Sequence, residues 1–126
     1  MPSVAIVDDE EGIRKALRRL LRASGLEAES YANGQEFLDA AAAHRPDCVV
    51  LDLHMPGMSG LQVLRKLKSI GQRLSIVVIT GHDEPETGEQ CIDAGAVAYL
   101  RKPLEDRLLL NAISAAMRSH AAPTKR

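Results

Sequence analysis

Five polar side chains lie at or just beyond the ends of short apolar segments in this sequence. They comprise three carboxylates, one hydroxyl and one amine: Asp8, Asp9, Asp52, Thr80 and Lys102. Bare carboxylates that meet repel one another by about 4 kcal/mol per pair at ~4 Å in partly screened surroundings, so a cation must balance them. Oxygen ligands without Cys or His favour a hard ion, and Mg²⁺ commonly keeps several waters that phosphate oxygens can replace. The amine and the hydroxyl would then pair with a phosphoryl group.

Five apolar segments alternate with patterns of helical spacing, and this alternation predicts where those side chains lie. The expected strands are 3–7, 27–32, 47–51, 75–80 and 96–100. Alternating strands and helices favour right-handed crossovers and an α/β fold with a doubly wound, five-stranded parallel sheet. Functional groups in such a sheet collect at the carboxyl ends of the strands. We therefore expect the five polar groups to share one rim of the sheet.

The expected helices follow these strands. Asn33 with Glu36, and Ser59 with Gln62, resemble capping pairs at two helix starts. Apolar residues on the helix that follows Ser59 are expected to face inward, and they are Leu61, Leu64, Leu67 and Ile70. The segment 85–94 carries few large apolar residues, which predicts a weakly anchored helix. The last helix is expected over 104–118, with its inward side chains at Leu104, Leu108, Ala112, Ile113 and Met117.

The composition restricts the class of protein. The chain has 126 residues and a net charge of −1, which fits one domain and gives no general electrostatic case for binding nucleic acid. No apolar run approaches the roughly 20 residues of a membrane span. Cys48 and Cys91 lie far apart in apolar contexts and indicate reduced core thiols of a cytoplasmic protein. We expect a single domain over 1–118, with 119–126 as a polar tail or the start of a linker.

Each acid taken alone has an ordinary explanation, because a lone Asp at a strand end is usually a helix cap or a turn residue. The joint pattern is more specific. Four motifs carry it, "VDDEE", "LDLHMPGMSG", "VITGH" and "YLRKP". In this order and spacing the chain resembles the receiver (CheY-like) domain of bacterial two-component response regulators, closest to the FixJ branch. The resemblance implies a flavodoxin-like sheet of order 2-1-3-4-5 with five helices.

The resemblance also implies roles for individual residues. Asp52 corresponds to the phosphoacceptor, and Thr80 and Lys102 to the residues that contact its phosphoryl group. The implied Mg²⁺ ligands are Asp9, Asp52, the backbone carbonyl of His54 and, through water, Asp8. Thr80 and Tyr99 correspond to the switch pair, and Pro103 to a cis proline after the lysine.

The implied partner is a sensor histidine kinase, and the implied function is a cytoplasmic, self-phosphorylating switch that is not a turnover enzyme. Phosphorylation would alter the face formed by residues 85–118, promote homodimerisation and control transcription through a DNA-binding domain that these residues do not contain. Alternatives are a single-domain regulator acting on a protein partner, a small aspartyl-phosphate phosphatase, and a degenerate receiver used as a constitutive binding module. The intact set of five polar residues argues against the last.

Other polar residues near the motifs carry less specific signals. The His54 side chain is expected to face solvent, and His82 either tunes dephosphorylation or is a plain loop residue. Four arginines on the outer side of the first helix are candidates for kinase contact, namely Arg14, Arg18, Arg19 and Arg22.

Overall fold

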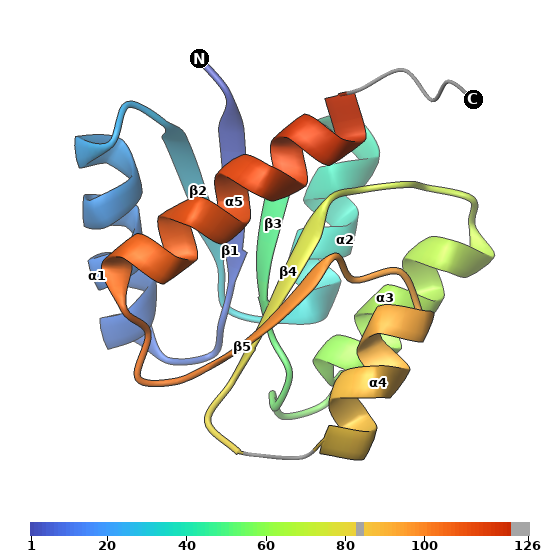
Figure 1. Ribbon diagram of the computed structural model, residues 1–126. Helices are drawn as coiled ribbons and strands as arrows, with labels where there is room; N and C mark the ends of the chain where they lie inside the picture. Colours follow the sequence, from blue (N-terminus) through green and yellow to red (C-terminus); the bar gives the residue numbers. More distant parts are fainter. Residues whose placement is uncertain (83–84, 122–126) are drawn as a thin grey trace.

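The computed structural model describes residues 1–82 and 85–121, in which five strands alternate with five helices (Figure 1). The strands are β1 (Ser3–Val7), β2 (Glu27–Tyr31), β3 (Cys48–Asp52), β4 (Ile76–Thr80) and β5 (Ala98–Arg101). The helices are α1 (Glu11–Ala23), α2 (Gly34–Ala43), α3 (Gly60–Ser69), α4 (Pro85–Asp93) and α5 (Asp106–Ala121). All strand pairs are parallel and the order is β2-β1-β3-β4-β5. The predicted doubly wound, flavodoxin-like sheet is therefore confirmed.

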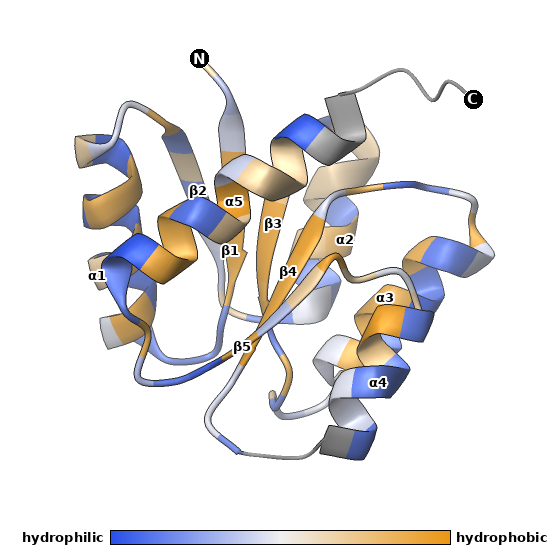
Figure 2. Ribbon diagram, viewed as in Figure 1, coloured by the Kyte–Doolittle hydropathy of each residue, from blue (hydrophilic) through white to orange (hydrophobic). Residues whose placement is uncertain are grey.

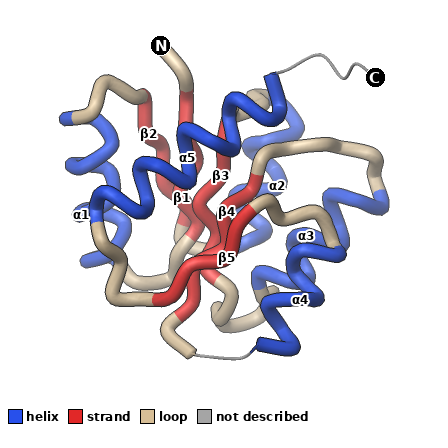
Figure 3. The backbone as a smooth tube through the Cα atoms, in the orientation of Figure 1, coloured by secondary structure: helices blue, strands red, loops and turns tan. Residues whose placement is uncertain are grey.

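The helices cover the sheet in two groups (Figure 3). On one face, Leu17 and Leu21 of α1 pack with Leu109 and Ile113 of α5 against β1, β3 and β4. On the other face, α2, α3 and α4 pack over a second core that includes Phe37. Strands buried on both sides read as continuous apolar runs, and Figure 2 shows this hydrophobic centre between the helices. Because the strands are parallel, their carboxyl ends meet at one edge, the lower edge in Figure 1.

Two predicted helix caps are confirmed. The Asn33 side chain accepts a hydrogen bond from the Glu36 N–H at 2.9 Å and begins α2. Ser59 and Gln62 form a reciprocal capping box, in which the Ser59 N–H donates to Gln62 Oε1 at 2.8 Å and the Gln62 N–H donates to Ser59 Oγ at 3.2 Å. This box fixes the start of α3, and with it the end of the turn that follows β3.

Two predicted inward side chains instead face solvent. Ile70 is the C-cap residue of α3 and is 57% exposed, while Val63 takes the buried position. Leu108 is 55% exposed, and the buried stripe of α5 runs through Leu109 and Ile113. Ile70 lies beyond Ser69, the last residue of α3, whereas in α5 packing against the sheet selects an apolar stripe through Leu109, one position from the expected Leu108.

Several element ends differ from the expected ones by one to three residues, and the largest differences are at β5 and α5. β5 begins at Ala98 because Gly95, with φ of +115°, ends the turn after α4, and the Ala96 N–H still bonds to the Cys91 carbonyl at 2.9 Å. α5 continues to Ala121, three residues beyond the expected end at 118. Residues 122–126 of the expected tail lie outside the described part of the chain. Both cysteines are free and buried. Among the described helices, none has the length and apolar character needed to cross a membrane.

Candidate functional site

Asp52 is the last residue of β3, and its position is fixed by the backbone around it. Its neighbours in the strand are fully buried, and Asp52 itself is only 3% exposed. The Leu53 N–H donates to the Ile79 carbonyl at 2.9 Å, and the Leu53 carbonyl accepts from the Gly60 N–H at 2.8 Å. Gly57 has a φ of +81°, which a glycine adopts without steric cost, and it lets the chain turn back to α3. The buried strand and closed turn hold the carboxylate at the rim of the sheet.

Gly60 lies against the backbone of Asp52 at the first position of α3. A Cβ atom at position 60 would stand 2.5 Å from the Asp52 carbonyl oxygen and 2.9 Å from Leu53 Cα. Neither atom belongs to a flexible side chain, so any larger residue must displace the backbone of β3. This packing role of Gly60 was not predicted; its signal was the short spacing between the strand end and the capping box.

The acidic loop after β1 brings two more carboxylates to the same rim. Asp8 is fully buried, and its Oδ1 accepts a hydrogen bond from the Glu10 N–H at 2.9 Å. The Asp8 carbonyl accepts from the Arg14 guanidinium at 2.8 Å, which ties the loop to α1. Asp9 is exposed at the mouth of the site. One carboxylate is thus locked in the interior while its neighbour faces solvent.

Lys102 reaches into this group from the end of β5. Its Nζ lies 3.1 Å from Asp8 Oδ2 and 3.5 Å from both Asp52 Oδ1 and Glu10 Oε1. The Lys102 N–H donates to the Thr80 carbonyl at 2.7 Å, and the Lys102–Pro103 peptide bond is cis, as the resemblance implied. The contact with Glu10 was not predicted, and the only signal for it was its place in the acidic run "DDEE".

The charges in this site are unevenly balanced. The pKa of Asp52 is raised to about 7, mainly by burial and next by the charge of Asp8; Lys102 opposes the rise and Asp9 adds to it. Burial lowers the pKa of Lys102, but the hydrogen bond to Asp8 and the surrounding carboxylates outweigh it, so the net shift is upward. One ammonium group therefore does not neutralise the carboxylates. The remaining negative charge favours the binding of a further cation at this site.

The raised pKa predicts how stability depends on pH. The folded protein holds the Asp52 proton more tightly than the unfolded chain, so this stabilisation is present below pH 4 and is lost as the pH rises through about 7. Asp52→Asn removes the ionisation. Without Mg²⁺, the variant should therefore become more stable relative to the native chain as the pH rises. We expect the free energy of unfolding of Asp52→Asn, minus that of the native chain, to be about 2 kcal/mol larger at pH 8 than at pH 4.5. Urea denaturation at both pH values measures this, and an advantage that does not change with pH would contradict the assignment.

The residues present fit a magnesium ion. Asp8, Asp9 and Asp52 each offer a carboxylate oxygen, and these oxygens lie within 4.8 Å of one another. The group contains only oxygen donors, as Mg²⁺ prefers, and one of its members is exposed so that waters can complete the coordination.

Thr80 and Tyr99 lie on neighbouring strands behind the acidic group. Thr80 is fully buried, and its Oγ1 accepts a hydrogen bond from the His82 N–H at 3.1 Å. Tyr99 is partly buried, opposite Val78 in the β4–β5 ladder. Its ring lies so close to Gly88 of α4 that a Cβ there would stand 3.1 Å from ring atom Cε2. Gly88 therefore gives the Tyr99 ring room beneath α4, a contact that was not predicted.

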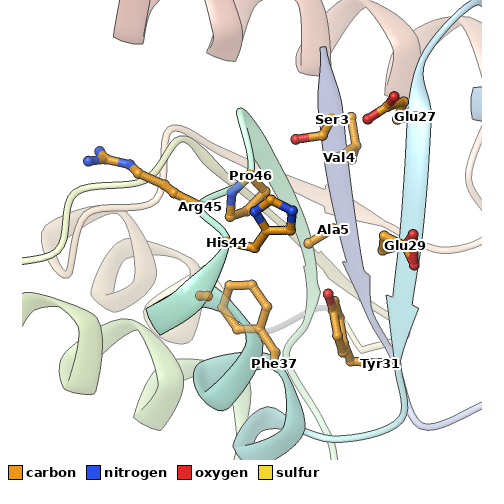
Figure 4. Close-up of a pocket in the computed structure, with 11 residues that line it drawn as sticks. Ser3, Val4, Ala5, Glu27, Glu29, Tyr31, Phe37, His44, Arg45 and Pro46 are labelled. Atoms are coloured by element: carbon orange, nitrogen blue, oxygen red, sulfur yellow. The ribbon is translucent and has the colours of Figure 1, made fainter. Parts of the chain in front are cut away.

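A separate cavity of about 180 Å³ lies on the α2 side of β1 and β2 (Figure 4). Glu29 and Tyr31 of β2 lie on one side of it, and His44 follows α2 on the other side. It shares no lining residue with the acidic group. The chemistry predicted from the sequence is therefore at the strand ends, outside this cavity.

Fold and site together define an α/β domain whose sheet carries a rim of acids, one lysine and one buried threonine. The family model described as "Response regulator receiver domain" matches residues 4–114. The chain therefore belongs to the receiver-domain family of two-component response regulators. Receiver domains generally bind Mg²⁺ at an acidic cluster and are phosphorylated by sensor histidine kinases.

The relatives are consistent with the expected FixJ-like character. The transcriptional regulatory protein FixJ of Azorhizobium caulinodans is 33% identical over 114 residues, which cover 90% of this chain and 54% of FixJ. The response regulator TodT of Pseudomonas putida is 37% identical over 98% of this chain and 53% of TodT. The crystal structure of FixJ-N superposes with a TM-score of 0.89 at 35% identity and covers 98% of both chains. The chain spans about half the length of these curated relatives.

Proposed function

We propose that Asp52 is the phosphoacceptor of this receiver and takes its phosphoryl group from a histidine kinase. The observation that supports this is the position of Asp52, a buried carboxylate at a strand end that faces Asp8 and Lys102. In the reaction, an Asp52 carboxylate oxygen forms a bond to phosphorus as the phosphorus–nitrogen bond of the kinase phosphohistidine breaks. The electron pair of that bond stays on the imidazole, and an aspartyl phosphate results.

The surrounding residues would bind the metal ion and contact the transferred phosphoryl group. Asp9, Asp52 and the His54 carbonyl would hold Mg²⁺, with Asp8 contributing through water. When bound, the ion supplies positive charge for the oxygens of the transferred group. Lys102, already 3.5 Å from Asp52, would pair with the new phosphate. The positions of these groups are largely set before the reaction, which is what phosphoryl transfer needs most.

Thr80 and Tyr99 would transmit the effect of phosphorylation from the site to the protein surface. The Thr80 hydroxyl would turn toward the phosphate, and the Tyr99 ring would move into the space it leaves. The helix beside Tyr99 is shallowly packed, because among the described α4 side chains only Cys91 is buried deeply. Three exposed apolar side chains lie on α4, the following loop and α5, namely Ile92 (47% exposed), Val97 (46%) and Leu108 (55%). We propose that the protein forms a homodimer on phosphorylation and that residues 85–118 provide the dimer interface.

This dimer model predicts the effect of a charge on its face. Leu108→Arg is expected to weaken dimerisation in the presence of Mg²⁺ and a beryllofluoride phosphoryl mimic by at least tenfold, because an unpaired guanidinium would be buried at the contact. Ile70→Arg is the matched control, since Ile70 is a similarly exposed apolar residue at the end of α3. Sedimentation equilibrium measures both. Equal weakening by the two variants, or equal dimerisation with and without the mimic, would exclude this face.

A groove between α1 and the loop before α5 supports the kinase as partner. Its apolar lining includes Ile13, Leu20 and Leu104, and Lys102 of the acidic site also lines it. Of the four α1 arginines, Arg14, Arg18 and Arg22 donate hydrogen bonds within the domain rather than projecting freely outward. Arg19 is exposed beside the groove and is the best placed of the four to meet a partner.

For the whole protein we propose a cytoplasmic regulator of transcription, in line with the transcriptional regulatory protein FixJ, that acts as a switch and not as a turnover enzyme. A single-domain regulator and a small phosphatase are the alternatives. Acetyl phosphate and p-nitrophenyl phosphate distinguish the last of these. From acetyl phosphate, a switch is expected to take up at most one phosphoryl group per chain. From p-nitrophenyl phosphate, it is expected to release no more than a trace of nitrophenol. Sustained multiple turnover of the ester would favour the phosphatase.

A further inference from the structure

Two histidine rings face each other beside the acidic site, and the proposed phosphorylation chemistry uses neither ring. The imidazoles of His54 and His82 have centroids 4.7 Å apart and an interplanar angle of 76°. Both residues are exposed. They come from different loops, each two residues beyond the end of a strand, and the two strands β3 and β4 are hydrogen-bonded neighbours. We propose that these two rings form a second metal site, which takes an imidazole-binding divalent ion such as Zn²⁺.

The spacing of the rings suits shared coordination. An ion that binds one nitrogen of each ring at ~2.0–2.1 Å, with a cis or tetrahedral angle, places the ring centroids roughly 5 Å apart. The observed separation of 4.7 Å agrees with this. Rotation about each metal–nitrogen bond is free, so the angle between the rings sets no obstacle.

The backbone under both rings is held in place. The His82 N–H donates to Thr80 Oγ1 at 3.1 Å, and Leu53, next to His54, donates its N–H to the Ile79 carbonyl at 2.9 Å. The ligands therefore start close together on supported loops, which lowers the entropic cost of chelation. The negative potential of the neighbouring carboxylates also favours a cation at this rim.

The donor chemistry separates this site from the acidic one. Imidazole nitrogen suits Zn²⁺, Ni²⁺ and Cu²⁺, whereas the carboxylates of Asp8, Asp9 and Asp52 suit Mg²⁺. Two protein ligands leave positions for water, so the ion would bind reversibly. One rim would then carry two ions of different kinds.

An ion bound by both rings would tie the loop after β3 to the loop after β4. The second loop is the one hydrogen-bonded to the Thr80 hydroxyl. This consequence rests on the proposed function, in which Thr80 turns toward the phosphate. Zinc would therefore hold the unphosphorylated arrangement and slow phosphorylation.

Isothermal titration with Zn²⁺ in saturating Mg²⁺ tests the site, because Mg²⁺ occupies the carboxylates during the measurement. We expect one Zn²⁺ per chain and a loss of affinity of at least tenfold in both His54→Ala and His82→Ala. The first variant keeps the backbone carbonyl of residue 54. His44→Ala is the matched control, since His44 is an exposed histidine that lies outside this pair, and it should bind Zn²⁺ as the native chain does. Unchanged binding in either paired variant, or an equal loss in the control, would overturn the site.

The regulatory consequence has its own measurement. Phosphorylation by acetyl phosphate is followed with and without Zn²⁺, and we expect a several-fold slowing in the native chain that is absent in His82→Ala. Equal slowing in both would overturn the regulation while leaving the binding result intact. Failure of the native chain to be phosphorylated without Zn²⁺ would instead count against the proposed function, so the two failures are distinguishable.

Discussion

Gly60→Ala is expected to lower the free energy of unfolding by about 1–3 kcal/mol, which is the usual cost of forcing extra atoms into a well-packed region. The new Cβ would stand 2.5 Å from the Asp52 carbonyl oxygen, so the start of α3 and the end of β3 must separate. That displacement moves the Asp52 carboxylate. We therefore also expect slower phosphorylation by acetyl phosphate, because misplacement of a reacting group by even a fraction of an ångström loses rate.

Gly12→Ala is the matched control for this effect. Gly12 lies in the first turn of α1, and a Cβ there meets no atom within 4 Å. Since alanine favours a helix over glycine, this variant should be as stable as the native chain or more stable by up to about 1 kcal/mol. Urea denaturation and the phosphorylation rate are measured for both. If Gly60→Ala unfolds and reacts like the native chain, then the close packing of α3 on β3 does not position Asp52.

Lys102→Met is expected to change two properties in opposite directions. The methionine keeps most of the length of the side chain but removes the ammonium that lies 3.1 Å from Asp8 and 3.5 Å from Asp52. Without this cation, the carboxylates attract Mg²⁺ more strongly, by about tenfold in affinity. Phosphorylation should slow by about 10- to 100-fold, since a charge-assisted hydrogen bond to the transferred group contributes roughly 1.5–3 kcal/mol.

Isothermal titration with Mg²⁺ and the rate of reaction with acetyl phosphate measure these two effects. Lys66→Met serves as the control, because Lys66 is exposed near the end of α3 and should leave both values unchanged. A variant that binds Mg²⁺ more weakly would show that Lys102 supports the metal rather than competing with it. A variant that reacts at the native rate would remove Lys102 from the chemistry.

Much of the site could be predicted because three of its polar residues lie at or just after the end of a buried parallel strand. Asp8, Asp52 and Thr80 follow apolar runs that are buried on both faces, and parallel strands bring their ends to one edge whatever the details of packing. The local signals at Asn33 and Ser59 were sufficient for two helix starts, since a cap depends only on nearby residues. These features are local or follow from topology alone.

Features that depend on contact between distant segments could not be predicted in this way. In α5, Leu109 is buried and Leu108 is exposed, because packing of the helix on the sheet determines which of its faces is buried. The reach of Lys102 to Glu10 joins positions 92 residues apart. The close approach of Gly88 to the Tyr99 ring likewise joins a helix to a strand, and a single glycine in a helical pattern does not reveal it.

Intact mass after incubation with acetyl phosphate and Mg²⁺ tests the central claim most directly. The native chain and Asp52→Asn are treated alike, quenched rapidly and compared. We predict a gain of one phosphoryl group in the native chain and no gain in the variant, because the amide lacks the nucleophilic carboxylate oxygen. A gain of equal size in Asp52→Asn, or no gain in the native chain with Mg²⁺ saturating, would contradict the assignment of Asp52 as the phosphoacceptor.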